Sequence, residues 1–100
     1  MNAQDFAEKL ASVKNETQLE SLGTEMLSNP VSDVPSWIGL NGDALIETYP
    51  MRFIDRVHEA KKYWRDSFLS LADDMTAPAV QDVEREKFWR DLANTITAGM

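Results

Sequence analysis

The sequence predicts an all-α fold: a small single-domain helical bundle of four to five helices built on a long antiparallel helix pair, with an irregular packed loop in the middle. Apolar residues recur at spacings of three and four over most of the chain, which is typical of helices that bury one face. The flanks of the Asn41-Gly42 turn signal do not alternate apolar and polar residues over enough positions to form strands. The 100 residues, 43% hydrophobic and 27% charged, have the size and composition of one globular domain, so residues 1–100 are interpreted as a single unit.

Two short helices are predicted first, over residues 3–14 and 17–28. Asn2 is the candidate cap of the first helix, and Thr17 to Glu20 has the spelling of a capping box for the second. One continuous helix over residues 3–28 remains an alternative, because nothing at the junction forbids it. Pro30 ends this part, since the residue before a proline resists helical geometry. The apolar stripes of the two helices are Ala3, Phe6, Ala7, Leu10, Val13, Leu19, Leu22, Met26 and Leu27.

The irregular loop spans residues 28–43 and is followed by a short helix over 43–49. Prolines, glycines, Ser, Asn and Asp make turns the expected structure of the loop. Its apolar residues, however, are too many for a solvated linker, so it is expected to pack onto the core. Asn41-Gly42 is also a hairpin signal, but its flanks do not alternate. The apolar residues of the loop are Val31, Val34, Trp37, Ile38 and Leu40.

The strongest helical pattern covers residues 50–74, and the rest of the chain is expected to pack against this helix. Thr48 is its candidate cap, and Pro50 suits a first turn, where a missing N–H costs nothing. At 1.5 Å per residue the helix is roughly 37 Å long. Its broad apolar stripe consists of Phe53, Ile54, Val57, Ala60, Trp64, Phe68, Leu69, Leu71, Ala72 and Met75.

A last helix is predicted over residues 78–98, with Thr76 as its candidate cap and Pro78 in its first turn. The short link to the preceding helix favours an antiparallel hairpin. Its predicted core residues are Val80, Val83, Phe88, Leu92 and Ile96. Trp89 is adjacent to Phe88, and one narrow seam does not hold both. We therefore expect Trp89 at the edge of the core or in a contact with another chain; the alternative is a wide buried face.

The net charge of −7 is unevenly distributed. Residues 1–49 carry eight acidic residues and two lysines, a balance of −6, whereas residues 50–100 have a balance of −1. Phosphate backbones repel an acidic surface, and basic clefts attract it. Solubility alone is the alternative explanation. The candidate binding residues are Glu16, Glu20, Glu25, Asp33, Asp43, Glu47 and Trp89.

No catalytic or metal-binding apparatus is recognisable. Cysteine is absent and His58 is the only histidine, so thiolate sites are excluded and a catalytic triad would need His58. The Asp55-x-x-His58 spacing weakly resembles a carboxylate-bridged metal site, but such a site needs further acidic ligands and usually a second histidine. No glycine-rich phosphate-binding loop occurs. We expect neither enzymatic activity nor a cofactor or metal. Carboxylate pairs such as Asp73-Asp74 are interpreted as solvated surface.

Direct nucleic-acid binding and membrane insertion are also not expected. The basic residues of 52–65 are interleaved with Tyr63 and Trp64, but acidic residues lie among them, so a salt-bridged outer face is the preferred interpretation. No basic leader and no apolar run of about 18 residues occurs. A cytoplasmic protein is the simplest interpretation.

Two functional hypotheses from different classes follow. The first is a non-enzymatic protein that mimics DNA in charge: it binds and blocks a basic, nucleic-acid-binding surface of a larger protein complex. Phage-encoded inhibitors of host defence, including anti-CRISPR proteins, are compact acidic proteins of this kind, and would act in the host cytoplasm; no motif carries a family resemblance. The alternative is a helical structural or assembly adaptor that forms homo- or hetero-oligomers, a homodimer included. A weaker third hypothesis is a small enzyme or metal protein centred on His58.

Overall fold

The computed structural model describes residues 1–34 and 55–98, and within these ranges the chain forms helices and no strand. The helices are α1 (Ala3–Ser12), α2 (Glu16–Ser28), α4 (Arg56–Asp74) and α5 (Val83–Thr97). The predicted all-α class is therefore confirmed. The predicted short helix over 43–49 lies outside the described residues, as does the loop after residue 34.

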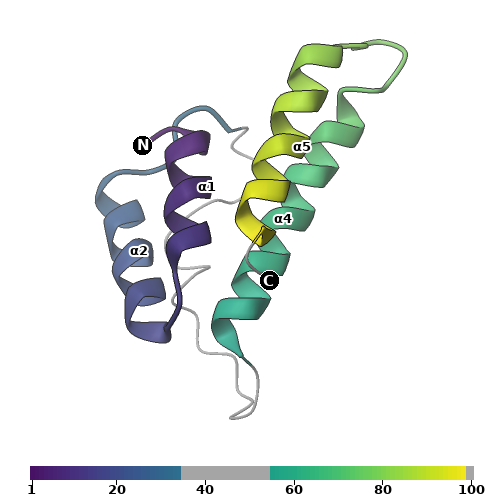
Figure 1. Ribbon diagram of the computed structural model, residues 1–100. Helices are drawn as coiled ribbons and strands as arrows, with labels where there is room; N and C mark the ends of the chain where they lie inside the picture. Colours follow the sequence, from purple (N-terminus) through teal and green to yellow (C-terminus); the bar gives the residue numbers. More distant parts are fainter. Residues whose placement is uncertain (35–54, 99–100) are drawn as a thin grey trace.

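Among the described helices, α4 and α5 make the most extensive contact. Figure 1 shows them side by side and running in opposite directions, joined by the turn at residues 75–82. The rings of Phe68 and Trp89 stack between them, with centroids 5.6 Å apart. The residues that the two helices bury are Ala60, Lys61, Trp64, Phe68, Leu71, Ala72, Trp89, Leu92, Ala93 and Ile96.

The helix α1 covers this hairpin, and α2 lies beside α1 (Figure 1). Phe6 of α1 is fully buried, and its ring meets Trp64 and Phe68 edge-on, at centroid distances of 5.5 and 6.2 Å. Edge-to-face packing of this kind adds to the stabilisation from burial. The main contact of α1 is with α5, whereas α1 and α2 approach one another over only a few residues. The N-terminal pair is thus held mainly through α1.

The ends of α1 and α2 are set by two asparagines. Asn2 caps α1 as predicted, since its side chain accepts from the Asp5 N–H at 2.8 Å. The predicted capping box at Thr17 is wrong: the cap of α2 is Asn15, whose side chain accepts from the Gln18 N–H at 2.9 Å. An asparagine with extended backbone is a strong cap, and here it comes two residues before the threonine. The chain therefore forms two helices, and α1 ends at Ser12 rather than at 14.

The starts of α4 and α5 also differ from the prediction. The helix α4 begins at Arg56 with Asp55 as its cap, not near Pro50; Thr48 and Pro50 lie outside the described residues. The helix α5 begins at Val83, capped by Asp82, instead of at residue 78. Gln81 explains the later start, because its positive φ of 42° interrupts any helix that began before it.

The buried face of α5 is rotated relative to the prediction. Val80 and Val83, predicted in the core, are 50% and 76% exposed. Trp89 is only 1% exposed, whereas its neighbour Phe88 is half-buried. Positions 89, 92, 93 and 96 form one helical face, and it is this face that meets α4. The expectation that Trp89 lies at the edge of the core or in an intermolecular contact is therefore wrong.

The described part of the central loop packs onto the core as predicted. Val31 is buried and Val34 is half-buried against the same cluster as α1. Ser32 donates its backbone N–H to the Met1 carbonyl at 3.0 Å. This segment is therefore fixed beside the start of α1.

Candidate docking site: an acidic groove between α1 and α2

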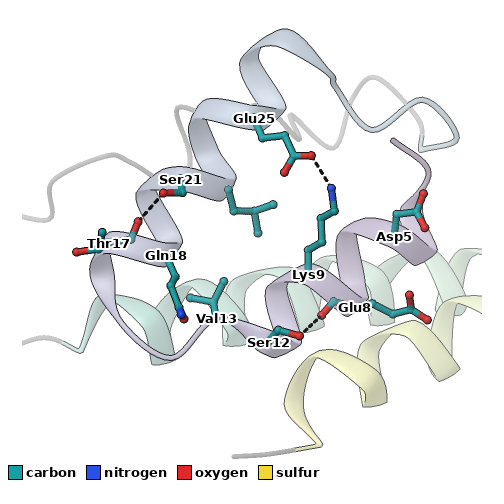
Figure 2. A pocket seen from close by; sticks show the side chains of 10 residues that line it. Asp5, Glu8, Lys9, Ser12, Val13, Thr17, Gln18, Ser21 and Glu25 are labelled. Atoms are coloured by element: carbon teal, nitrogen blue, oxygen red, sulfur yellow. Dashed lines mark hydrogen bonds and ion pairs between the residues drawn. The ribbon is translucent and has the colours of Figure 1, made fainter.

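An open groove of about 520 Å³ lies between α1 and α2 (Figure 2). Its α1 wall is formed by residues spaced three and four apart, which therefore share one helix face: Asp5, Glu8, Lys9 and Ser12. The α2 wall is likewise one polar face, formed by Thr17, Gln18, Ser21 and Glu25.

Among the described residues that line the groove, Val13 and Leu22 are the apolar ones. Both side chains are about 5% exposed, so they form a floor beneath the polar walls. The groove exists because α1 turns its apolar face to the α4–α5 hairpin, which leaves polar side chains between α1 and α2. The groove thus has an apolar floor between two polar walls.

The charge of the groove is negative. Of the described residues that line it, Asp5, Glu8 and Glu25 are acidic and Lys9 alone is basic. The Lys9 ammonium lies 2.5 Å from the Glu25 carboxylate, and Figure 2 shows the two side chains pointing toward one another across the groove. Among the described residues, Asp5 and Glu8 make no ion pair. Two carboxylates therefore remain available to an external cation.

Glu16 and Glu20, both predicted binding residues, lie near the start of α4 instead of in the groove. Each carboxylate is 3.6 Å from Nη1 of Arg56, whose side chain is 12% exposed. The glutamate side chains themselves remain more than half exposed. They connect α2 to α4, and their charge is partly neutralised within the chain.

Asp33 has a structural role. Its carboxylate accepts from the backbone N–H of Ala3, the first residue of α1, at 2.6 Å. An acidic group at this position stabilises a helix N-terminus, because it satisfies an unpaired N–H and complements the helix dipole. Asp33 thus holds the described loop segment against α1.

Of the predicted binding residues that the structure describes, only Glu25 lines the groove. Asp43 and Glu47 lie outside the described residues, and Trp89 is buried between α4 and α5. The polar faces of α1 and α2 were visible in the sequence, but any solvated helix shows such a face. Nothing in the pattern indicates that the two faces would meet.

The Asp55-x-x-His58 spacing is explained by helix capping. The Asp55 carboxylate accepts from the backbone N–H of His58 at 3.1 Å, and the His58 side chain is exposed. An aspartate that bonds the N–H three residues on is an ordinary N-cap. In residues 1–34 and 55–98, no group of three His, Asp or Glu side chains is placed to hold a metal ion.

The basic residues of α4 are used within the fold. Lys62 and Arg65 pair with Glu59 and Asp66, at 3.9 and 2.9 Å, as the salt-bridged interpretation predicts. Trp64 is fully buried and unavailable for stacking on a base. Arg52 lies outside the described residues.

Lys61 differs from its neighbours because it is buried, at 8% exposed. Its ammonium donates to the Ala11 carbonyl at 3.1 Å, close to the C-terminus of α1. Burial is the main cause that lowers the pKa of Lys61 below 10.5; the Lys14 charge lowers it further, and Asp55 opposes both. Sequence spacing had placed this lysine on the outer face.

No family model matches the chain, and no curated protein and no solved structure matches it either. None of the helices in the described part of the chain is both long and apolar enough to cross a bilayer.

Proposed function

We propose that this protein is a non-enzymatic interaction protein whose α1–α2 face docks on a basic surface of a larger protein complex and thereby keeps nucleic acid off that surface. The observation that carries the proposal is the acidity of this face. Residues 1–34 hold six acidic residues and two lysines, and the groove between α1 and α2 includes two carboxylates, Asp5 and Glu8, without an ion pair among the described residues.

The charge pattern of the α4–α5 hairpin supports the choice of face. Residues 55–98 contain nine acidic and seven basic residues, and four of the basic side chains pair with nearby carboxylates. A surface of mixed sign attracts neither a basic nor an acidic partner strongly. A surface of one sign steers an oppositely charged partner toward it and speeds association. An anti-defence inhibitor of the anti-CRISPR kind, acting in the host cytoplasm, would work in this way, by occupying the basic surface that otherwise binds nucleic acid.

The test is a pull-down with tagged protein from nuclease-treated cell lysate, repeated with added DNA or RNA. We expect one nucleic-acid-handling complex to be captured and then released by the competitor, and capture to weaken with salt because exposed charges are screened. Capture that ignores both nucleic acid and salt would contradict the proposal.

Charge-reversal variants locate the binding face. The double variant Asp5→Lys with Glu8→Lys should lose the complex, while Asp74→Lys with Asp91→Lys should keep it. The second pair makes the same change in net charge on exposed residues of the hairpin, and none of the four carboxylates forms an ion pair in the described part of the chain. Equal loss in both variants would mean that net charge, not this face, decides binding. Circular dichroism verifies that each variant is folded.

A second candidate function, an assembly adaptor, is favoured by the apolar tip of the hairpin. Val80 and Val83 are half or more exposed there, and exposed apolar residues can mark a protein contact. Sedimentation at increasing concentration tests this function. An adaptor that self-associates through the tip gains mass with concentration, and Val83→Ser abolishes the gain; a constant mass argues against self-association.

A further inference from the structure

We infer that the α1–α2 groove is the seat of one cationic amphipathic helix of the basic partner, with a basic side chain at the groove carboxylates and an apolar side chain on the Val13–Leu22 floor. This inference rests on the proposed function and specifies the partner element. In this groove, negative charge and an apolar floor lie together.

The shape of the groove suits a helix. Both walls are continuous faces of antiparallel helices (Figures 1 and 2). The shorter wall, α1, has 10 residues and is therefore about 15 Å long, or roughly three helical turns. An amphipathic helix laid between two helices is a common recognition mode, read by anchors three and four residues apart.

The residues that line the groove favour a helix that carries both a basic and an apolar side chain. A purely apolar helix would desolvate Asp5 and Glu8, which form no ion pair among the described residues, without offering them a partner. Burying an unpaired carboxylate is costly. A purely polar cation would make no apolar contact with Val13 and Leu22 at the bottom of the groove. Arginine or lysine next to leucine satisfies both, because the aliphatic stem of the basic residue also packs on apolar surface while its charged end reaches a carboxylate.

Lys9 already shows how a cation is held in this groove. Its ammonium crosses from α1 to Glu25 on α2. The side chains of both residues are 40% or more exposed, and surface pairs of this kind contribute only about 0.2–1 kcal/mol. The pair is therefore easily exchanged, and Lys9 acts as an internal placeholder that the basic side chain of the partner displaces.

Synthetic peptides test the inference directly. Three 14-residue helical peptides are titrated into the full chain by calorimetry: one with arginine and leucine on one face, one with serine in place of leucine, and one with glutamate in place of arginine. We expect the arginine–leucine peptide to bind at least about tenfold more tightly than either control, a difference equivalent to 1.4 kcal/mol. Equal binding of the arginine–serine peptide would overturn the inference, since the floor would then contribute nothing.

Two matched pairs of variants assign the binding to the groove. Ser21→Trp fills the groove without a change in charge and should abolish binding of the arginine–leucine peptide; Ser70→Trp, at an exposed position of α4, should not. Lys9→Met removes the placeholder and should strengthen binding several-fold more than Lys14→Met, which removes the same charge from an exposed site outside the groove lining. Unchanged binding by Ser21→Trp, or equal effects of the two lysine variants, would refute the inference.

The failures of the two proposals are distinguishable. If Ser21→Trp still captures a complex that nucleic acid releases, the blocking function stands and the groove is not its seat. If the arginine–leucine peptide binds in the groove but no complex from lysate competes with nucleic acid, the groove is a docking site and the blocking function is wrong.

Discussion

Truncation of Trp89 is expected to cost a large part of the stability of the fold. Trp89 is 1% exposed, stacks on Phe68 at 5.6 Å, and lies 5.6 Å beneath the guanidinium of Arg85. Replacing a buried tryptophan with alanine costs about 3–5 kcal/mol, because apolar burial is lost and a cavity remains. Domains of this size have a free energy of unfolding of about 5–15 kcal/mol. Trp89→Ala should therefore remove at least about a fifth of the free energy of unfolding, and nearly all of it if the native stability is at the low end of that range.

The assay is urea denaturation followed by far-ultraviolet circular dichroism. Phe88→Ala is the matched control: it truncates the adjacent aromatic residue, which is only half-buried, and its cost should be less than half as large. Trp89→Phe keeps a ring against Phe68 and should fall between wild type and Trp89→Ala, so the comparison remains possible if Trp89→Ala does not fold. The slope of free energy against urea should stay constant, which shows that the change is in stability.

Comparable costs for Trp89→Ala and Phe88→Ala would refute this reasoning. So would a cost below about 1 kcal/mol for Trp89→Ala, which is typical of a residue outside the core. Either result would mean that Trp89 lies at the edge of the bundle, as the sequence predicted, and is accessible as a binding residue.

Two further predictions concern polar residues at α1. Asp33→Ala should lower the free energy of unfolding by about 0.5–2 kcal/mol, because the Ala3 N–H loses its acceptor. Asp33→Asn keeps an acceptor oxygen and should lose less; identical thermal unfolding of both variants and wild type would show that Asp33 does not hold α1. For Lys61, burial lowers the pKa, so the unfolded state binds more protons between the folded-state pKa and 10.5. Wild type should gain stability relative to Lys61→Met as pH rises through that window, measured by urea denaturation at several pH values; a pH-independent difference would contradict this.

The helical class of the described residues follows from the sequence because it depends on local periodicity. The stripe through Ala60, Trp64, Phe68 and Leu71 is buried as its spacing predicts, and Asn2 caps α1 from the position where the sequence places it. Capping and period act over three or four neighbouring residues. Such features can be recognised without knowing what packs against the helix.

Helix boundaries were less predictable, because several residues compete for each cap. Thr17 and Asn15 both suit the start of α2, and the structure uses Asn15. The choice depends on where the chain must turn to bring the helices together. The same holds at Asp82, where the turn through Gln81 delays α5 to Val83.

The sequence by itself determined that this protein is acidic in its first half and all-helical in its described part. Only the tertiary structure decided which charges remain available. It turns Asp33 to the N-terminus of α1, Glu16 and Glu20 to Arg56, and Lys61 to the end of α1, and it brings Asp5 and Glu8 to a groove that they share with Glu25. A charge count depends on composition alone, whereas a binding surface depends on which side chains the packing of α1 against α5 leaves facing solvent together.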